Sequence, residues 1–208
     1  MKRPVKRIAF YLGVAILIGA GFMAGRDMLS PAGWQAALPL SRTEGTASIG
    51  GPFTLVDHTG KSVTEADFRG RFMLVYFGFT YCPDACPTAL STMAGALDII
   101  GAAADRVVPV FVSVDPERDT PEQLDMYVRH FHPSLVGLTG SAEQVAVAAK
   151  AFRVYYAKVK EEGLDEDEYT MDHTSNIYLM GPNGKFRTHF SGPATSPETM
   201  AAGILDVL

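Results

Sequence analysis

The chain has 208 residues and a formal net charge of −5 at pH 7, a length that fits one domain with an additional segment. All 23 acidic residues and 13 of the 18 basic residues follow position 26, which gives that part of the chain a net charge of −10. An acidic balance of this size argues against nucleic acid as a partner and against attraction to an anionic membrane surface.

The first 26 residues predict a membrane anchor. Four basic residues among the first seven precede an uncharged run of seventeen residues, Ile8 to Ala24, at the lower edge of what spans a bilayer core of about 30 Å. A cleaved signal peptide is the competing interpretation. The run is longer than the usual apolar region of ~7–15 residues, however, and no small-x-small cleavage site with a polar approach follows it. We therefore favour a retained transmembrane helix.

The charges flanking the apolar run predict the orientation. Because the cations lie before the run, we expect the N-terminus in the cytoplasm and the rest of the chain across the membrane. Only seven residues precede the run, too few for a mitochondrial presequence, so the expected location is a bacterial inner membrane with the domain in the periplasm. The expected organisation is an anchor over 1–26, a linker without sustained periodicity over 27–50 and one domain over 51–208.

Two short strands around a turn at Asp57–Gly60 are expected first, followed by a short helical piece that begins at Thr64. The apolar run Phe72 to Phe79 then predicts a buried strand. It leads into a short loop that holds both cysteines of the chain, Cys82 and Cys86. This loop is where we expect the chemistry of the protein.

Each cysteine precedes a proline, and a residue before proline is pushed towards extended geometry, so we expect neither cysteine inside a helix. Pro87 suits the first position of a helix that runs to Ile100, which makes Cys86 the expected N-cap. The partial positive charge of a helix N-terminus favours thiolate over thiol. We therefore predict two ionisable sulfurs that face each other.

The remaining chain alternates strands and helices. The predicted strands cover 107–114, 135–138, 154–159, 176–180 and 185–190, and the predicted helices begin after Thr120, Ser141 and Ser196, the first of them ending near Phe131. Residues 160–168 carry seven charges, of which six are acidic, and are expected to form a solvated loop. This order fits an α/β thioredoxin-like sandwich with an N-terminal hairpin extension.

Two thiols with three residues between them fit either a dithiol redox pair or a metal site. Around a soft ion with metal–sulfur distances of about 2.3 Å, two thiolates lie roughly 4 Å apart, and the loop can reach this separation or close to a disulfide. A structural bridge is the weaker explanation, because it would close a very small loop and add little stability. A metal site needs a third ligand, for which His173 is the best candidate.

Three segments resemble the signatures of the Sco/SenC family of membrane-anchored copper proteins. They are FTYCPDACP at 79–87, VDPERDTP at 114–121 and DHT at 172–174, and the similarity covers the chain from about Gly51 to its end. Thioredoxins have two residues between their cysteines rather than three. The resemblance implies that Cys82, Cys86 and His173 bind copper, as Cu(I) or Cu(II).

The implied function is a copper metallochaperone that supports assembly of the binuclear copper site of a cytochrome c oxidase subunit. Another periplasmic copper chaperone or a thiol reductant is a further expected partner, and no catalytic residue is predicted. Two alternatives remain open: a thiol-disulfide reductant of that site's cysteines, and a copper or redox sensor that signals through 160–168. Asp84 and Asp115 are expected to tune the site or orient His173, and Met171 is expected to pack in the core.

Overall fold

The computed structural model describes residues 48–160 and 169–208, which belong to one compact unit. The predicted anchor, almost all of the predicted linker and most of the acidic run lie outside the described residues. Within them, the helical stretch Ala85–Arg106 is long and apolar enough to cross a membrane by length and composition alone. Its first part is a helix of the folded domain, with eight buried residues.

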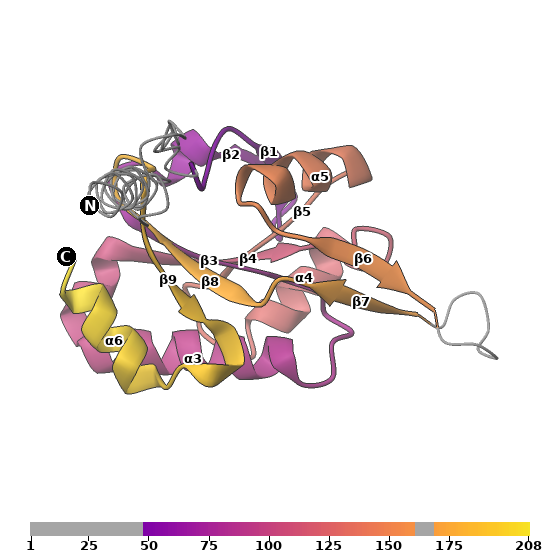
Figure 1. Cartoon of the computed structure of the whole chain (residues 1–208). Coiled ribbons are helices and arrows are strands. Elements are labelled where there is room, and N and C mark those ends of the chain that lie inside the picture. The colour runs from indigo at the N-terminus through magenta and orange to yellow at the C-terminus, as the bar shows by residue number, and fades with distance from the viewer. Residues whose placement is uncertain (1–47, 161–168) are drawn as a thin grey trace, which may run out of the picture. The chain divides into compact units, whose positions relative to one another are not determined.

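A seven-stranded mixed sheet forms the centre of the domain (Figure 1). Its strand order is β2-β1-β5-β4-β3-β8-β9, in which β3, β4 and β5 are mutually parallel and the other neighbours are antiparallel. The bounds are Thr54–Asp57 for β1, Ser62–Thr64 for β2, Phe72–Gly78 for β3, Val107–Ser113 for β4, Val136–Thr139 for β5, Asn176–Met180 for β8 and Phe186–Ser191 for β9. All residues of β3 and β4 are buried, as expected for central strands covered on both faces.

Helices cover both faces of this sheet. They are α3 (Ala85–Ile100), α4 (Pro121–Val128), α5 (Ala142–Ala151) and α6 (Pro197–Leu205), with short 3-10 helices over Glu65–Phe68, Gly101–Arg106 and Gly192–Ala194. Figure 1 shows α3 and α6 together below the sheet and α5 above it. On the α5 side, the ring of Phe77 in β3 packs on Phe152 at the end of α5. Its neighbours Tyr76 and Gly78 face the opposite side, towards α3.

Polar side chains begin three of the helices at the predicted positions. Thr120, Ser141 and Ser196 each accept a hydrogen bond from the backbone amide three residues later. The helix α4 ends at Val128, three residues before the predicted end at Phe131. Pro133 disfavours helical geometry in the residue before it, and the chain makes turns there instead.

A second sheet of two strands carries residues of the DHT segment. Strand β6 (Tyr156–Val159) pairs antiparallel with β7 (Thr170–His173), and Tyr156 lies opposite His173. The strand predicted over 154–159 begins at Tyr156, two residues after its predicted start. Arg153, with a left-handed φ of 56°, ends α5 just before it. Strand β7 itself was not predicted. Its Met171 is buried, as expected for a packing residue.

Candidate metal centre

The loop after β3 leads directly into α3, and this start differs from the prediction. Asp84 is the N-cap of α3, so Cys86 is the second residue of the helix and Pro87 the third. The prediction that Cys86 lies outside the helix as its N-cap was therefore wrong. Amides of the first helical turn have no partner within the helix, so a proline can occupy the third position without loss of a hydrogen bond.

The two cysteines differ in exposure and in their hydrogen bonds. Cys86 is fully buried and Cys82 is half-buried, and both are free thiols. The backbone amide of Cys86 donates to Cys82 Sγ over 3.4 Å, so the sulfur at the helix N-terminus is that of Cys82. Hydrogen bonding between the two side chains lowers the pKa of Cys82, and backbone amides that donate to its sulfur lower it further. The same bond, together with burial, raises the pKa of Cys86. The pair therefore shares one proton, and Cys82 carries the negative charge.

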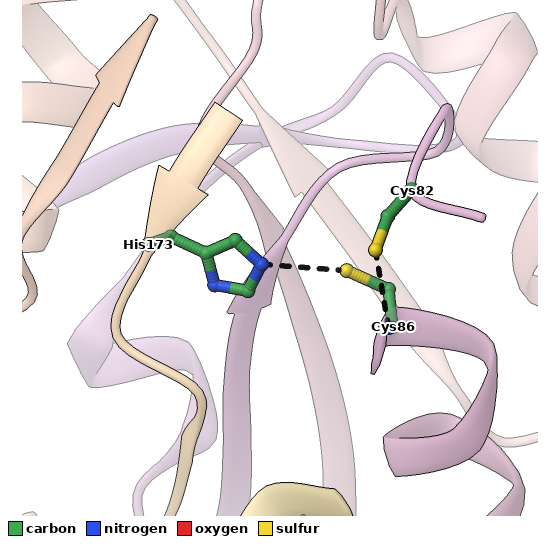
Figure 2. A group of neighbouring side chains, drawn as sticks. All are labelled: Cys82, Cys86 and His173. Carbon is green, nitrogen blue, oxygen red and sulfur yellow. Dashed lines mark hydrogen bonds between the residues drawn. The ribbon is translucent and has the colours of Figure 1, made fainter. Parts of the chain in front are cut away.

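His173 lies at the end of β7 and points its ring at the sulfurs (Figure 2). Its Nε2 is 3.6 Å from Cys86 Sγ, and its Nδ1 is 3.1 Å from the carbonyl oxygen of Thr174. A carbonyl can only accept a hydrogen bond, so Nδ1 holds the proton of the neutral ring and the lone pair of Nε2 faces the sulfurs. The rings of Tyr76 and Phe79 contact the imidazole edge to face, with centroids 6.0 and 5.9 Å away.

The three side chains form one group with the donor atoms of a metal site. The ligand atoms of Cys82, Cys86 and His173 all lie within 4.8 Å of one another, and across residues 48–160 and 169–208 no other such group is found. Two thiolates on a trigonal ion are roughly 4 Å apart, so a contraction of less than ~1 Å would bring the sulfurs to coordinating positions. Two sulfurs and an imidazole are suited to a soft or borderline ion such as copper or zinc.

The two acidic residues expected near the ligands have different surroundings. Asp84 is exposed, and its carboxylate accepts from the hydroxyl of Thr88 at 3.5 Å. Asp115 is 2% exposed and pairs with Arg118, while it accepts a hydrogen bond from the hydroxyl of Tyr169 at 2.8 Å. The imidazole of His173 is oriented by a hydrogen bond that its Nδ1–H donates to the carbonyl oxygen of Thr174, and neither carboxylate accepts from it.

Sequence reasoning missed Gly78, the last residue of β3. A Cβ at this position would lie 2.6 Å from Cys86 Sγ and 2.9 Å from the ring of Phe111. The glycine therefore makes the space in which the buried sulfur lies. A glycine at the end of an otherwise bulky strand is a usable signal, since it often marks a close approach of other atoms.

Asp119 was also missed, although it belongs to one of the quoted motifs. Its buried carboxylate accepts from the amide and hydroxyl of Thr80, at 3.0 and 2.6 Å, and from the hydroxyl of Ser113 at 2.6 Å. Burial raises the pKa of this carboxyl group. The side chain ties the start of the cysteine loop to the end of β4, so it fixes the loop to the sheet.

Comparisons with known proteins agree with this geometry. The family described as SCO1/SenC matches residues 41–208. Protein sco1 of Schizosaccharomyces pombe is 44% identical over 161 residues, which are 77% of this chain and 61% of that protein. The chain thus spans about three fifths of the length of that curated relative.

Solved structures give the same result and confirm the thioredoxin-like α/β fold. The structure of Bradyrhizobium japonicum ScoI with copper bound is 43% identical, covers 77% of this chain and 100% of its own and has a TM-score of 0.70. BsSco, described as having a disulfide switch and as a member of the Sco family of cytochrome c oxidase assembly proteins, is 30% identical with a TM-score of 0.56, over 76% of this chain and 96% of its own. With the family match over most of its length, the chain belongs to the SCO1/SenC family.

Proposed function

We propose that this protein binds one copper ion through Cys82, Cys86 and His173 and transfers it during assembly of the binuclear copper site of cytochrome c oxidase. The observation that carries the proposal is the convergence of the three ligand atoms within 4.8 Å of one another. A relative that is 43% identical has a structure with copper bound, which supports copper as the ion.

The donor set suits an ion that is carried and then given up. Thiolates favour Cu(I), and an imidazole is an acceptable ligand for both Cu(I) and Cu(II). Because Cys82 is already ionised, binding displaces only the proton shared with Cys86. Cys82 is half-buried and Cys86 is buried, so Cys82 is the sulfur that an acceptor protein reaches first.

The proposed location follows from the N-terminal segment. We place the protein in the inner membrane with a single pass over 1–26, its N-terminus in the cytoplasm and the copper site in the periplasm. The expected partners are the copper-bearing subunit of cytochrome c oxidase and a second periplasmic chaperone or thiol reductant.

The test is a competitive Cu(I) titration of the full-length chain in mild detergent under anaerobic conditions. We expect one copper per parent chain, and a loss of affinity of at least ~100-fold in Cys82→Ser, Cys86→Ser and His173→Ala, since even residues that only orient ligands are worth 10–100-fold. The matched control is His130→Ala, which alters an exposed histidine just after α4. If all three site variants bind Cu(I) as tightly as the parent, the assignment of the ligands is wrong.

The sulfur pair also supports a second candidate, a thiol-disulfide reductant. Cys82, with its lowered pKa, is the nucleophile: its thiolate attacks an oxidised partner and forms a mixed disulfide. Cys86 then attacks Cys82, which leaves a Cys82–Cys86 disulfide and a partner with two reduced thiols. The partner gains two electrons from the sulfur pair, one proton from that pair and a second proton from solvent, because Cys82 enters the reaction as a thiolate. The description of BsSco as having a disulfide switch is consistent with this chemistry.

His173 separates the two candidates. In the reductant, turnover of an oxidised dithiol peptide needs both cysteines, so His173→Ala should retain parental activity. In the copper protein, His173→Ala should lose copper affinity while the cysteines keep their reactivity. If His173→Ala retains both parental copper affinity and parental reductase turnover, His173 is not a ligand and the reductant is the better assignment.

A further inference from the structure

The strand that carries His173 is not part of the central sheet. Strands β6 and β7 pair with each other and form a sheet of their own, which projects beyond the central sheet in Figure 1. Cys82, in contrast, lies in the loop that follows directly on the central strand β3, and Cys86 lies in the first turn of α3, which that loop leads into. Only Thr174 and Ser175 join β7 to β8 of the central sheet, so the distance between His173 and the sulfurs depends on this short connection and on the side chains that tie the small sheet to the rest of the domain.

Arg118, in the loop between β4 and α4, contacts both sides of the site. Its guanidinium carbon lies 3.7 Å from the ring centroid of Tyr169, directly before β7, and 4.7 Å from that of Tyr81, directly before Cys82. Its Nη1 donates to the carbonyl oxygen of Tyr169 over 3.1 Å. One planar side chain thus lies between the cysteine loop and the strand of the histidine.

Neighbouring groups hold this guanidinium in place. Its Nε pairs with the buried carboxylate of Asp115 at 2.5 Å, and the other oxygen of that carboxylate accepts from the hydroxyl of Tyr169 at 2.8 Å. Lys158 of β6 pairs with Glu117 at 2.7 Å and also lies 4.0 Å from the Tyr169 ring. We call this group the Arg118 clasp; its members are Tyr81, Asp115, Glu117, Arg118, Lys158 and Tyr169.

The clasp also reaches the imidazole through one aromatic ring. The guanidinium of Arg118 lies 6.0 Å from the centroid of Phe79, and the Phe79 ring contacts His173 edge to face. Phe79 is buried, so it transmits a change at Arg118 to the ligand by direct packing. Lysine cannot replace these contacts, because a single ammonium has neither the planar face nor the divergent donors of a guanidinium.

We propose that Arg118 is a positioning residue that holds His173 within coordinating distance of Cys82 and Cys86. The proposal rests on the proposed copper site. It assigns to the clasp a part in setting the third ligand, beside the core rings of Tyr76 and Phe79 that pack on the imidazole. Asp115 acts here through Arg118 and Tyr169, which gives this buried carboxylate a role without direct contact to the ligands.

The first experiment needs no metal. Hydrogen exchange of the amides of Met171–His173 is compared in the full-length apo-protein, in Arg118→Lys and in Arg118→Ala. The lysine variant keeps a positive charge beside Asp115 and so guards against a general loss of folding. We expect exchange at these amides to rise at least ~10-fold in both variants, since the two sheets are then joined by fewer contacts. Arg129→Ala, which removes an exposed arginine paired with Asp125 on α4, is the matched control and should exchange like the parent.

The second experiment asks whether Arg118 acts through His173. We expect Arg118→Lys to weaken Cu(I) binding ~10–100-fold, the usual effect of a residue that orients a ligand. In a His173→Ala background the same substitution should have no further effect, since the ligand that it positions is absent. The affinity of Arg129→Ala should equal that of the parent.

The outcomes separate this inference from the proposed function. Parental exchange in both Arg118 variants, or an equal loss of copper affinity with and without His173, would overturn the role of the clasp. If His173→Ala instead binds copper as tightly as the parent, the proposed site is wrong. The exchange measurement would still decide whether Arg118 holds β7.

Discussion

Gly78→Ala is the most direct test of how the fold makes room for the buried sulfur. The added methyl carbon would lie 2.6 Å from Cys86 Sγ, 2.9 Å from Cε2 of Phe111 and 3.1 Å from Cε1 of Tyr76. Carbon atoms in contact prefer about 3.5–4.0 Å, so these groups must move by up to ~1 Å. Cys86 lies in the first turn of α3 and Phe111 in the central strand β4, and neither can move without disturbing its neighbours.

The expected cost is that of overpacking a dense core. Such insertions cost about 1–3 kcal/mol of the free energy of unfolding, and the lower chain entropy of alanine over glycine offsets this by only about 0.4–1 kcal/mol. The displaced sulfur should also weaken Cu(I) binding ~10–100-fold, as for other disturbances of ligand position.

Urea unfolding followed by circular dichroism measures the first effect, and competitive Cu(I) titration the second. The matched control is Gly51→Ala, where an added Cβ would meet its nearest neighbour, the Cβ of Ala151, at 3.4 Å. This variant should be as stable as the parent or more stable by up to about 1 kcal/mol. If Gly78→Ala matches Gly51→Ala in both stability and copper affinity, the space beside the sulfur is not what the glycine provides.

Three further outcomes follow from the charges of the site. Because the pKa of Cys82 is lowered, its alkylation by iodoacetamide should decline less between pH 8 and 5 than that of an ordinary thiol of pKa about 8.5, as mass spectrometry of the modified peptide would show; a parallel decline would contradict the shift. A thiol whose pKa is lower in the folded than in the unfolded state adds stability at high pH, and this stability is lost as the pH falls. The free energy of unfolding of the parent should therefore rise relative to that of Cys82→Ser as the pH increases to ~8.5. A difference that does not change with pH would contradict the lowered pKa of Cys82. Asp119→Ala leaves two hydroxyls and one amide without their acceptor and should cost about 3 kcal/mol in urea unfolding, with Asp125→Ala, at a half-buried position on α4, as the milder comparison.

Much of the fold was predictable from local chemistry. Continuous apolar runs located β3 and β4, and a polar side chain directly ahead of a helix located the starts of α4, α5 and α6. These signals are local, because burial on both faces requires an apolar run and an unpaired amide requires a nearby acceptor. The two cysteines of the metal-site group could be predicted because few side chains offer soft donors, whereas His173 was predicted as a ligand through the resemblance to the Sco/SenC family.

What failed depended on three-dimensional context. The rule for residues before proline placed Cys86 outside the helix, but free amides in the first turn allow Pro87 inside it. Strand β7 has only four residues and one aliphatic side chain, too short a pattern to mark a strand, and its pairing with β6 spans the acidic run. The contact between Arg118 and Tyr169 joins residues 51 apart in the chain, so no local pattern predicts it.

The ligands are divided between the segment 82–86, which leads from β3 into α3, and strand β7, and this division has a thermodynamic consequence. Under the proposed function, the ion closes a ring through residues that are 87 positions apart, so coordination and the seating of the small sheet are linked equilibria. Linkage is reciprocal: any partner that pulls β7 away from the domain lowers the affinity for the ion by the same factor by which the ion resists that movement. Under this linkage, an acceptor protein that binds the small sheet of β6 and β7 releases the ion. Asp119 meanwhile holds the loop of Cys82 in place for the next copper ion.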